Sequence, residues 1–209
     1  MKVIYEDEYI KVLEKPAGVV VDDISRRVHR LDKDTSGVFL VAKDDKTLEF
    51  LQKQFQERKV EKSYFALVVG NLKNEEGIIE TLLGRSPKDR RKQKVYLPQD
   101  PAAQGKRKAI TKYQVLQRFE NYDLIEAEPQ TGRKHQIRAH LTYLGHPIAG
   151  DKLYGFKNQP LPEGLKRQFL HSNYLKIKLL NGKEKEFKSE LPDDLKLCLQ
   201  NLKPLSKPN

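Results

Sequence analysis

The sequence lacks the features that mark several large classes of protein. One cysteine, Cys198, among 209 residues allows no internal disulfide and leaves no cysteine framework for structural zinc. No apolar run approaches the roughly 18 residues that would span a bilayer. The opening MKVIYEDEYIKVLEKP alternates apolar and charged residues and has no continuous apolar stretch of a signal peptide. These absences predict a cytoplasmic protein with no membrane partner.

The motifs of common enzyme classes are missing too. There is no Walker sequence, no Rossmann glycine fingerprint and no G-x-S-x-G. His135 and His140 are five residues apart, so on a helix they differ by roughly 140° and share no face for a zinc ion. A single cysteine cannot supply the Pro-Cys-x-x-Cys element of nucleobase deaminases. We therefore expect no metal and no cofactor.

Positive charge is abundant and unevenly distributed. The net charge is +11, and residues 84–113 contain ten Lys and Arg residues against two Asp residues. A concentrated basic segment without a membrane anchor favours nucleic acid as the partner. The alternatives are a solvated loop and a generally basic proteome.

Residue periodicity predicts an α+β fold. Period-two patterns and apolar runs indicate strands, a 3.6-residue pattern indicates helices, and Asn181–Gly182 indicates a hairpin turn. Strands are expected at 3–6, 9–14, 37–43, 63–70, 76–84, 106–119, 122–129, 169–180 and 183–190, and helices at 45–59, 133–144 and from 192. We expect one domain, residues 1–209, with a mixed, mostly antiparallel sheet flanked by helices and loops. Residues 86–106 are expected to form an extended hairpin or a disordered loop.

Asp32 stands out in the stretch VHRLDKDTSG, residues 28–37. It comes two residues after Arg30 and shortly before the apolar run at 37–43. A catalytic carboxylate needs a rigid element to hold it, and a buried strand supplies one. The alternative is a turn or capping aspartate.

A second basic cluster, QTGRKHQIRAH, is expected to open the helix at 133–144. Arg133 and Lys134 would then lie near its N-terminus, where cations oppose the helix dipole. Residues that break a local rule without compensation are candidates for function. An arginine here could clamp a phosphate or pair with a carboxylate. The alternative is a solvated helix face with Ile137 and Leu141 turned to the core.

Several motifs in order give the chain a family resemblance. HRLDKDTSGVFLVAKD resembles the signature of RluA-type RNA pseudouridine synthases. EKSYFALVVG resembles their tyrosine-bearing strand, and GRSPKDRRKQKVY with GKRKAITKYQVL resembles their basic RNA-gripping hairpin. TGRKHQIRAHLTYLGHPIAGDKLYG and FLHSNYL complete the set. The resemblance covers nearly the whole chain and implies a pseudouridine synthase fold and cofactor-free isomerisation of uridine in tRNA or rRNA.

The resemblance also implies residue roles. Asp32 matches the catalytic aspartate, Tyr64 the tyrosine that packs on the target base and is implicated in proton transfer, and Arg133 the residue that ion-pairs with the aspartate. Arg30 matches the arginine that fills the gap left by a flipped nucleotide, and Ile137 an apolar residue of the uracil pocket. Arg30 has two alternatives, a phosphate contact and an ion pair with a loop carboxylate. The RNA-contacting residues expected in the basic segment are Arg90, Arg91, Lys92, Lys106 and Arg107.

Two departures from the family shape the remaining expectations. Only VVVDDISRRV separates KPAG from HRLD, where the family commonly has a longer loop, and no S4-like RNA-binding module is expected before the catalytic domain. RNA recognition should therefore depend on the domain's own loops, chiefly 84–113, in a monomer with no protein partner. A non-catalytic RNA-binding protein or RNA chaperone on the same fold is the main alternative. A carboxylate-dependent glycosidase or nuclease is a further one.

Overall fold

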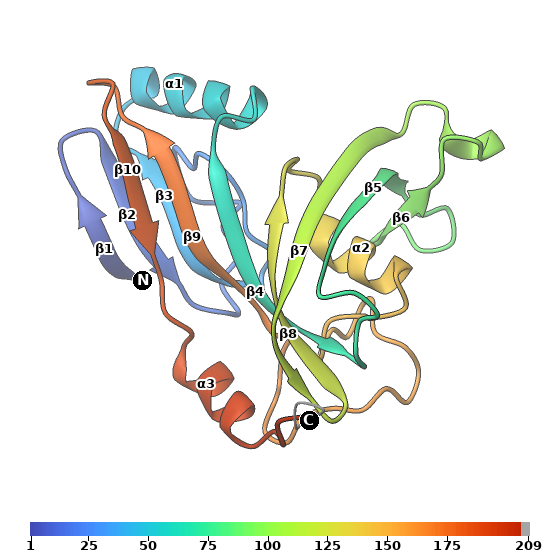
Figure 1. The fold of residues 1–209 in the computed structure, drawn as a ribbon. Helices are drawn as coiled ribbons and strands as arrows, with labels where there is room; N and C mark the ends of the chain where they lie inside the picture. The colour runs from blue at the N-terminus through green and yellow to red at the C-terminus, as the bar shows by residue number, and fades with distance from the viewer. Residues whose placement is uncertain (206–209) are drawn as a thin grey trace. The chain divides into compact units, whose positions relative to one another are not determined.

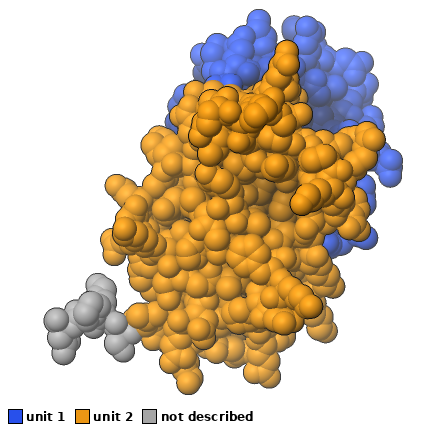
Figure 2. Space-filling model, turned by 90° about the vertical axis from the view of Figure 1, so that its right-hand side faces the viewer, with its two compact units in different colours: residues 1–64, 170–192 blue, residues 65–169, 193–209 orange. Residues whose placement is uncertain are grey.

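The computed structural model describes residues 1–205, which divide into two compact units. Unit 1 comprises residues 1–64 and 170–192, and unit 2 comprises residues 65–169 together with the chain from 193 onward (Figure 2). Strand β4 (Glu61–Val69) begins in unit 1 and continues into unit 2. No helix among the described residues is long and apolar enough to cross a membrane.

Unit 1 is a sheet with one helix packed on it (Figure 1). Its elements are β1 (Lys2–Glu6), β2 (Ile10–Lys15), β3 (Ser36–Ala42), α1 (Asp45–Gln56), β9 (Leu170–Lys178) and β10 (Glu184–Lys188). The order of pairing is β1–β2–β3–β9–β10, with β3 and β9 parallel and the other pairs antiparallel. The prediction of a mixed, mostly antiparallel sheet in an α+β fold is confirmed.

Helix α1 forms where the sequence supplies both a cap and an apolar face. Asp44 precedes the helix, and its carboxylate accepts a hydrogen bond from the Thr47 backbone N–H at 2.8 Å. Leu51 on the inner face is buried in an apolar cluster with residues of β2, β3 and β9. Strand β3 is buried on both sides, as its continuous apolar run predicts.

Gly37 allows β3 and β9 to approach closely. Its φ is +117°, and a Cβ there would lie 2.1 Å from the backbone oxygen of Ser172. No side chain fits at that distance, so the glycine of the TSG sequence is required by packing. The close approach places Ser172 beside the start of β3.

Unit 2 contains a sheet of long antiparallel strands and two helices. Its further elements are β5 (Glu76–Arg85), β6 (Gln93–Tyr96), the 3₁₀ turn Pro101–Ala103, β7 (Arg107–Phe119), β8 (Tyr122–Pro129), α2 (Gln136–Tyr143) and α3 (Asp193–Gln200). The order of pairing is β8–β7–β5–β6. Helix α2 packs on β6, β7 and β8 (Figure 1). Of the two expectations for residues 86–106, the hairpin is confirmed for β6, which pairs with β5, while residues 97–106 contain the 3₁₀ turn.

The predicted start of helix α2 is wrong by about one turn. The sequence pattern predicted residues 133–144, but the helix begins at Gln136 because His135 takes a left-handed conformation with φ 52° and ψ 23°. Arg133 and Lys134 therefore lie in the turn before the helix. Because they are outside the helix, they do not oppose its dipole from within the first turn.

Candidate active site

Asp32 lies on a loop whose backbone is fixed on both sides. Leu31 before it is buried in a small apolar cluster with Val21 and Phe39. After it, the chain turns, and the Thr35 N–H donates to the Asp32 carbonyl oxygen at 3.1 Å. Strand β3 begins one residue later, and the Asp32 side chain is half-buried. A carboxylate held in this way points in a direction that the fold determines.

A buried ammonium group braces the same loop. Lys15, at the end of β2, has a side chain that is 0% exposed. Its Nζ donates to the carbonyl oxygens of Pro16, Lys33 and Thr35 at 2.9, 2.8 and 2.8 Å. A buried charge is costly unless its hydrogen-bonding groups are satisfied, and three acceptors match the three ammonium protons. Sequence reasoning missed this residue, because no periodicity indicates that a lysine beside Pro16 faces inward.

Tyr64 packs against the apolar cluster that contains Leu31. Burial is the main cause that raises the pKa of the Tyr64 phenol to about 12. A hydrogen bond with the Ser172 side chain acts against this rise, and the charge of Asp32 adds to it. Unit 1 therefore brings Asp32 and Tyr64 close enough to interact electrostatically, and the phenol is neutral at ordinary pH.

Side chains of the FLHSNYL motif fix β9 within unit 1. No roles were expected for these residues from the sequence. The Ser36 hydroxyl lies 2.9 Å from His171 Nδ1, and His171 Nε2 lies 3.0 Å from the Ser189 carbonyl oxygen. A carbonyl can only accept, so Nε2 carries the proton and Nδ1 accepts from Ser36. The Ser63 hydroxyl donates to the Asn173 side chain at 3.0 Å. These bonds hold the strand on which Ser172 meets the Tyr64 hydroxyl.

His29, three residues before Asp32, is a neutral structural side chain. Its ring is stacked on Phe55 at a centroid distance of 5.1 Å, and its Nε2 accepts from the Leu40 N–H at 3.1 Å. Burial lowers the pKa of His29 to about 3, and the charge of Lys62 lowers it further. Lys62 lies 5.5 Å above the Phe55 ring, and burial lowers its own pKa to about 8.

Arg30 is exposed and pairs with a carboxylate of its own loop. The Arg30 guanidinium lies 3.6 Å from Asp22, which is also 3.5 Å from Arg27. This is one of the two alternatives that the sequence left open for Arg30. An exposed pair of this kind stabilises by at most about 1 kcal/mol, so it leaves Arg30 available to other partners.

Arg133 lies in unit 2, in the turn that leads into α2. Its Nε donates to the Lys108 carbonyl oxygen at 3.0 Å, and its backbone N–H donates to the Gln136 side chain at 3.0 Å. Arg133 as a whole is half-buried. Its position is thus determined by β7 on one side and by the first residue of α2 on the other.

Helix α2 turns both apolar and polar side chains inward. Ile137, the expected pocket residue, is buried. His140 is buried as well and lies 3.0 Å from the Thr81 hydroxyl and 2.9 Å from the Thr111 hydroxyl. Burial lowers the pKa of His140 to about 4, so it is neutral and structural. Within residues 1–205 no three His, Cys, Asp or Glu side chains gather in a group that could hold a metal ion.

The basic segment 84–113 carries its cations in three different settings. Arg90 and Arg107 are exposed. Arg91 is held by Asp89, which accepts two hydrogen bonds from its guanidinium at 3.0 and 2.8 Å. Lysines lie over tyrosine rings: Lys106 is 5.2 Å from the centroid of Tyr96, and Lys92 is 5.9 Å from that of Tyr154. Of the five RNA-contacting residues expected from the sequence, Arg90, Arg91 and Arg107 are exposed, whereas Lys92 and Lys106 are half-buried.

Several known proteins are similar to this chain in sequence or in structure. A curated protein of Aquifex aeolicus, named an uncharacterized RNA pseudouridine synthase, is 40% identical over 79% of this chain and 59% of its own length. A protein of Borreliella burgdorferi named ribosomal large subunit pseudouridine synthase D is 36% identical over 95% of this chain and 68% of its own. A solved structure, titled human RNA pseudouridylate synthase domain containing 1, matches with a TM-score of 0.84 and 25% identity over 99% of this chain and 89% of that one.

The chain also matches a family of proteins. Residues 22–143, which include Asp32, Tyr64 and Arg133, match the family described as RNA pseudouridylate synthase. The chain spans 59% and 52% of the length of two of its curated relatives. Matches of this identity and extent show more than a shared fold, and the chain belongs to the RNA pseudouridylate synthase family.

Proposed function

We propose that this protein is an RNA pseudouridine synthase that isomerises uridines of tRNA or rRNA to pseudouridine without a cofactor. The observation that carries the proposal is the position of Asp32 on a braced loop at the start of β3, next to the cluster on which Tyr64 packs. Family membership supports it. The name of the Borreliella burgdorferi relative favours ribosomal RNA among the possible substrates.

Asp32 is the proposed catalytic residue. In the isomerisation the bond from C1′ to N1 breaks and a bond from C1′ to C5 forms. N1 gains a proton and C5 loses one, so the reaction is balanced without any other reactant. A carboxylate can act at C1′ or stabilise positive charge that develops on the sugar. Asp32 suits this role because a carboxylate oxygen can act without activation by a separate base.

Tyr64 is proposed to hold the detached base by its ring. Burial raises the pKa of Tyr64 to about 12, so the phenol is rarely ionised at pH 7. A base that is so rarely ionised is a poor acceptor for the C5 proton, whereas an aromatic face can stack on uracil in either state. The structure therefore favours the packing role over the proton-transfer role that the resemblance also implies.

The other site residues keep the roles that the resemblance implies. Arg133 is proposed to ion-pair with the catalytic aspartate, as the resemblance implies. Arg30 fills the space of the extruded uridine, and its weak pairing with Asp22 is compatible with such a change of partner. Ile137 lines the uracil pocket. The segment 84–113 binds the RNA backbone through Arg90, Arg91, Lys92, Lys106 and Arg107.

The test is tritium release from RNA that carries [5-³H]uridine. Wild-type protein should release tritium to water, and Asp32→Asn should release none above background while keeping its fold and its affinity for RNA. Asp23→Asn, an exposed residue of the preceding loop, is the matched control and should retain full activity. Turnover by Asp32→Asn within about tenfold of wild type, or about 1.4 kcal/mol of barrier, would contradict the assignment.

The same assay separates the alternatives. A non-catalytic RNA-binding protein or chaperone would bind RNA and release no tritium. A glycosidase would release free uracil, and a nuclease would shorten the RNA, so chromatography of the products distinguishes both from an isomerase. Digestion of the treated RNA to nucleosides should yield pseudouridine in the amount of the tritium released.

A further inference from the structure

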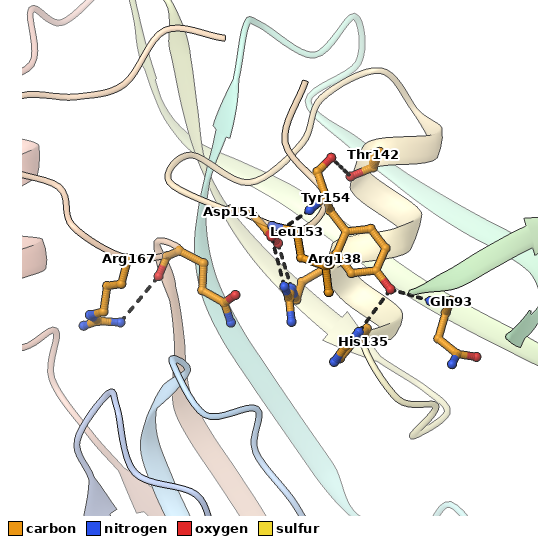
Figure 3. A network of polar contacts seen from close by, with 9 residues as sticks. Gln93, His135, Arg138, Thr142, Asp151, Leu153, Tyr154 and Arg167 are labelled. Carbon is orange, nitrogen blue, oxygen red and sulfur yellow. Dashed lines mark hydrogen bonds and ion pairs between the residues drawn. The ribbon is translucent and has the colours of Figure 1, made fainter. Parts of the chain in front are cut away.

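The hydroxyl of Tyr154 contacts two elements of unit 2 for which we propose separate roles. The backbone N–H of Gln93 donates to the Tyr154 oxygen at 2.6 Å, and His135 Nδ1 lies 3.1 Å from the same oxygen (Figure 3). Gln93 is the first residue of β6 and belongs to the basic segment 84–113. His135 immediately precedes α2 and comes two residues after Arg133. One atom thus connects the proposed RNA-binding segment with the turn that carries Arg133.

Tyr154 is well fixed and can serve as a rigid support. Its side chain is 6% exposed and packs on Leu83, Ala109 and Ala139. Its backbone N–H donates to Asp151 at 2.9 Å, and Asp151 also accepts two hydrogen bonds from Arg138 at 2.7 and 2.9 Å (Figure 3). A buried carboxylate that is satisfied by a guanidinium and by backbone N–H groups has little freedom to move.

His135 is held in a backbone conformation that histidine rarely adopts. Its φ of 52° and ψ of 23° lie in the left-handed region, which is unfavourable for a residue with a side chain. Such conformations persist only where the surrounding structure holds them. The contact with the Tyr154 hydroxyl is one restraint on His135, and the path of the chain at His135 decides where Arg133 and the turn before α2 lie.

We propose that Tyr154 is a positioning residue, which sets the basic segment 84–113 and the Arg133 turn at a fixed spacing through its hydroxyl group. The proposal rests on the proposed function. RNA held by the segment is then presented to Arg133 in one register, and loss of the hydroxyl lets the two elements move independently. Tyr154 itself contacts no reacting atom. It acts through Gln93 on one side and through His135 on the other.

The test is a double-mutant cycle on the catalytic rate. Tyr154→Phe removes one oxygen and keeps the packed ring. His135→Asn keeps a residue that tolerates the left-handed region, but its shorter side chain does not reach the Tyr154 oxygen. Each change should lower kcat about tenfold and change the Kd for RNA by less than about threefold. Because both remove the same link, the double variant should be no slower than the slower single variant. Tyr143→Phe, with Tyr143 48% exposed on α2, is the matched control and should behave as wild type.

Three results would overturn the proposal. The first is a Tyr154→Phe protein with the wild-type kcat. The second is a double variant whose loss of kcat is the product of the two single losses, which means that the residues act independently. The third is a loss confined to the affinity for RNA. If Tyr154→Phe does not fold, His135→Asn alone still tests the proposal, because it must lower kcat at unchanged affinity.

Hydrogen exchange provides a readout that does not depend on catalysis. In Tyr154→Phe the Gln93 amide and the amides of residues 133–136 should both exchange faster than in wild type. Faster exchange at Gln93 alone would show that the hydroxyl supports only the hairpin, and would refute the link. A wild-type protein that releases no tritium would refute the proposed function instead, and the exchange data would still show whether the link exists.

Discussion

Positive charge is used in opposite ways in two regions of this molecule. At the loop that carries Asp32, the ammonium of Lys15 is fully buried and donates to three carbonyl oxygens. In the basic segment 84–113, Arg90 and Arg107 lie exposed in solvent. A buried charged group that makes all its hydrogen bonds within the protein holds the backbone in place. An exposed charge remains available to a ligand.

The physical reason lies in the cost of removing a charge from water. A buried ammonium is tolerated only where its hydrogen bonds are made within the protein, so it cannot exchange them for bonds to RNA. An exposed guanidinium keeps its hydration and pairs with phosphate by releasing counterions. The first region should therefore control the reaction rate, and the second should control affinity.

The largest expected effect follows from removal of the buried charge. Lys15→Met keeps the length of the side chain but leaves the carbonyl groups of Pro16, Lys33 and Thr35 without this donor. We expect kcat to fall at least about 100-fold, because the loop after Asp32 loses its brace, and the free energy of unfolding to fall by about 2–4 kcal/mol. The Kd for RNA should change by less than about threefold. Tritium release, urea denaturation and filter binding measure the three quantities.

The matched control for this variant is Lys11→Met. Lys11 lies on the same strand but is only half-buried, and among the ion pairs of residues 1–205 it pairs only with Glu6, at 3.2 Å. It should change kcat and stability little. A Lys15→Met protein that is less stable but turns over within tenfold of wild type would show that Lys15 supports the fold and not the catalytic loop.

A smaller effect, on affinity alone, is expected from the basic segment. Replacement of Arg90, Arg91 and Lys92 by alanine should weaken RNA binding about 10- to 100-fold and leave kcat at saturating RNA within about threefold. The slope of log K against log salt should become shallower by about 0.7–0.9 for each phosphate that the variant no longer neutralises. Binding isotherms at four or five salt concentrations measure the slope.

Single variants sharpen this prediction. Arg91 is already paired with Asp89, so Arg91→Ala should cost less affinity than Arg90→Ala. Lys46→Ala, an exposed cation of α1 outside the segment, is the control and should leave the salt dependence unchanged. An unchanged slope in the triple variant would mean that these residues do not bind the RNA backbone.

The smallest expected effect is a loss of stability at low pH, caused by His29 near Asp32. The pKa of His29 is about 3 in the folded protein and about 6.5 in the unfolded chain. Between these values the unfolded chain binds more protons, so stability is lost as the pH falls from 6.5 toward 3. At pH 5.5 this loss amounts to at most about 1.4 kcal/mol relative to pH 7.5. Chemical denaturation at the two pH values measures it.

His29→Gln is the variant that isolates this effect. Glutamine can offer an oxygen to the Leu40 N–H in place of Nε2, but it does not titrate. The variant should therefore show a smaller loss of stability between pH 7.5 and 5.5 than wild type. An equal loss in both proteins would assign the acid sensitivity to other groups.

Local sequence patterns predicted much of the fold. Alternation marked β1 and β2, the continuous apolar run marked the buried strand β3, and Asn181–Gly182 marked the turn between β9 and β10. The first residue of α2 could not be predicted from a local sequence pattern. The left-handed conformation of His135 is held by the surrounding fold, including the contact with Tyr154, 19 residues further along the chain.

The sequence by itself determined the family, the identity of the candidate residues Asp32, Tyr64 and Arg133, and the concentration of charge in the segment 84–113, because motifs and composition are local properties of a chain. Only the tertiary structure decided that Lys15 braces the Asp32 loop, that burial raises the pKa of the Tyr64 phenol and that Tyr154 joins two elements of unit 2. Burial and hydrogen bonding between segments distant in sequence produce these features, and no local pattern encodes which buried group meets which partner.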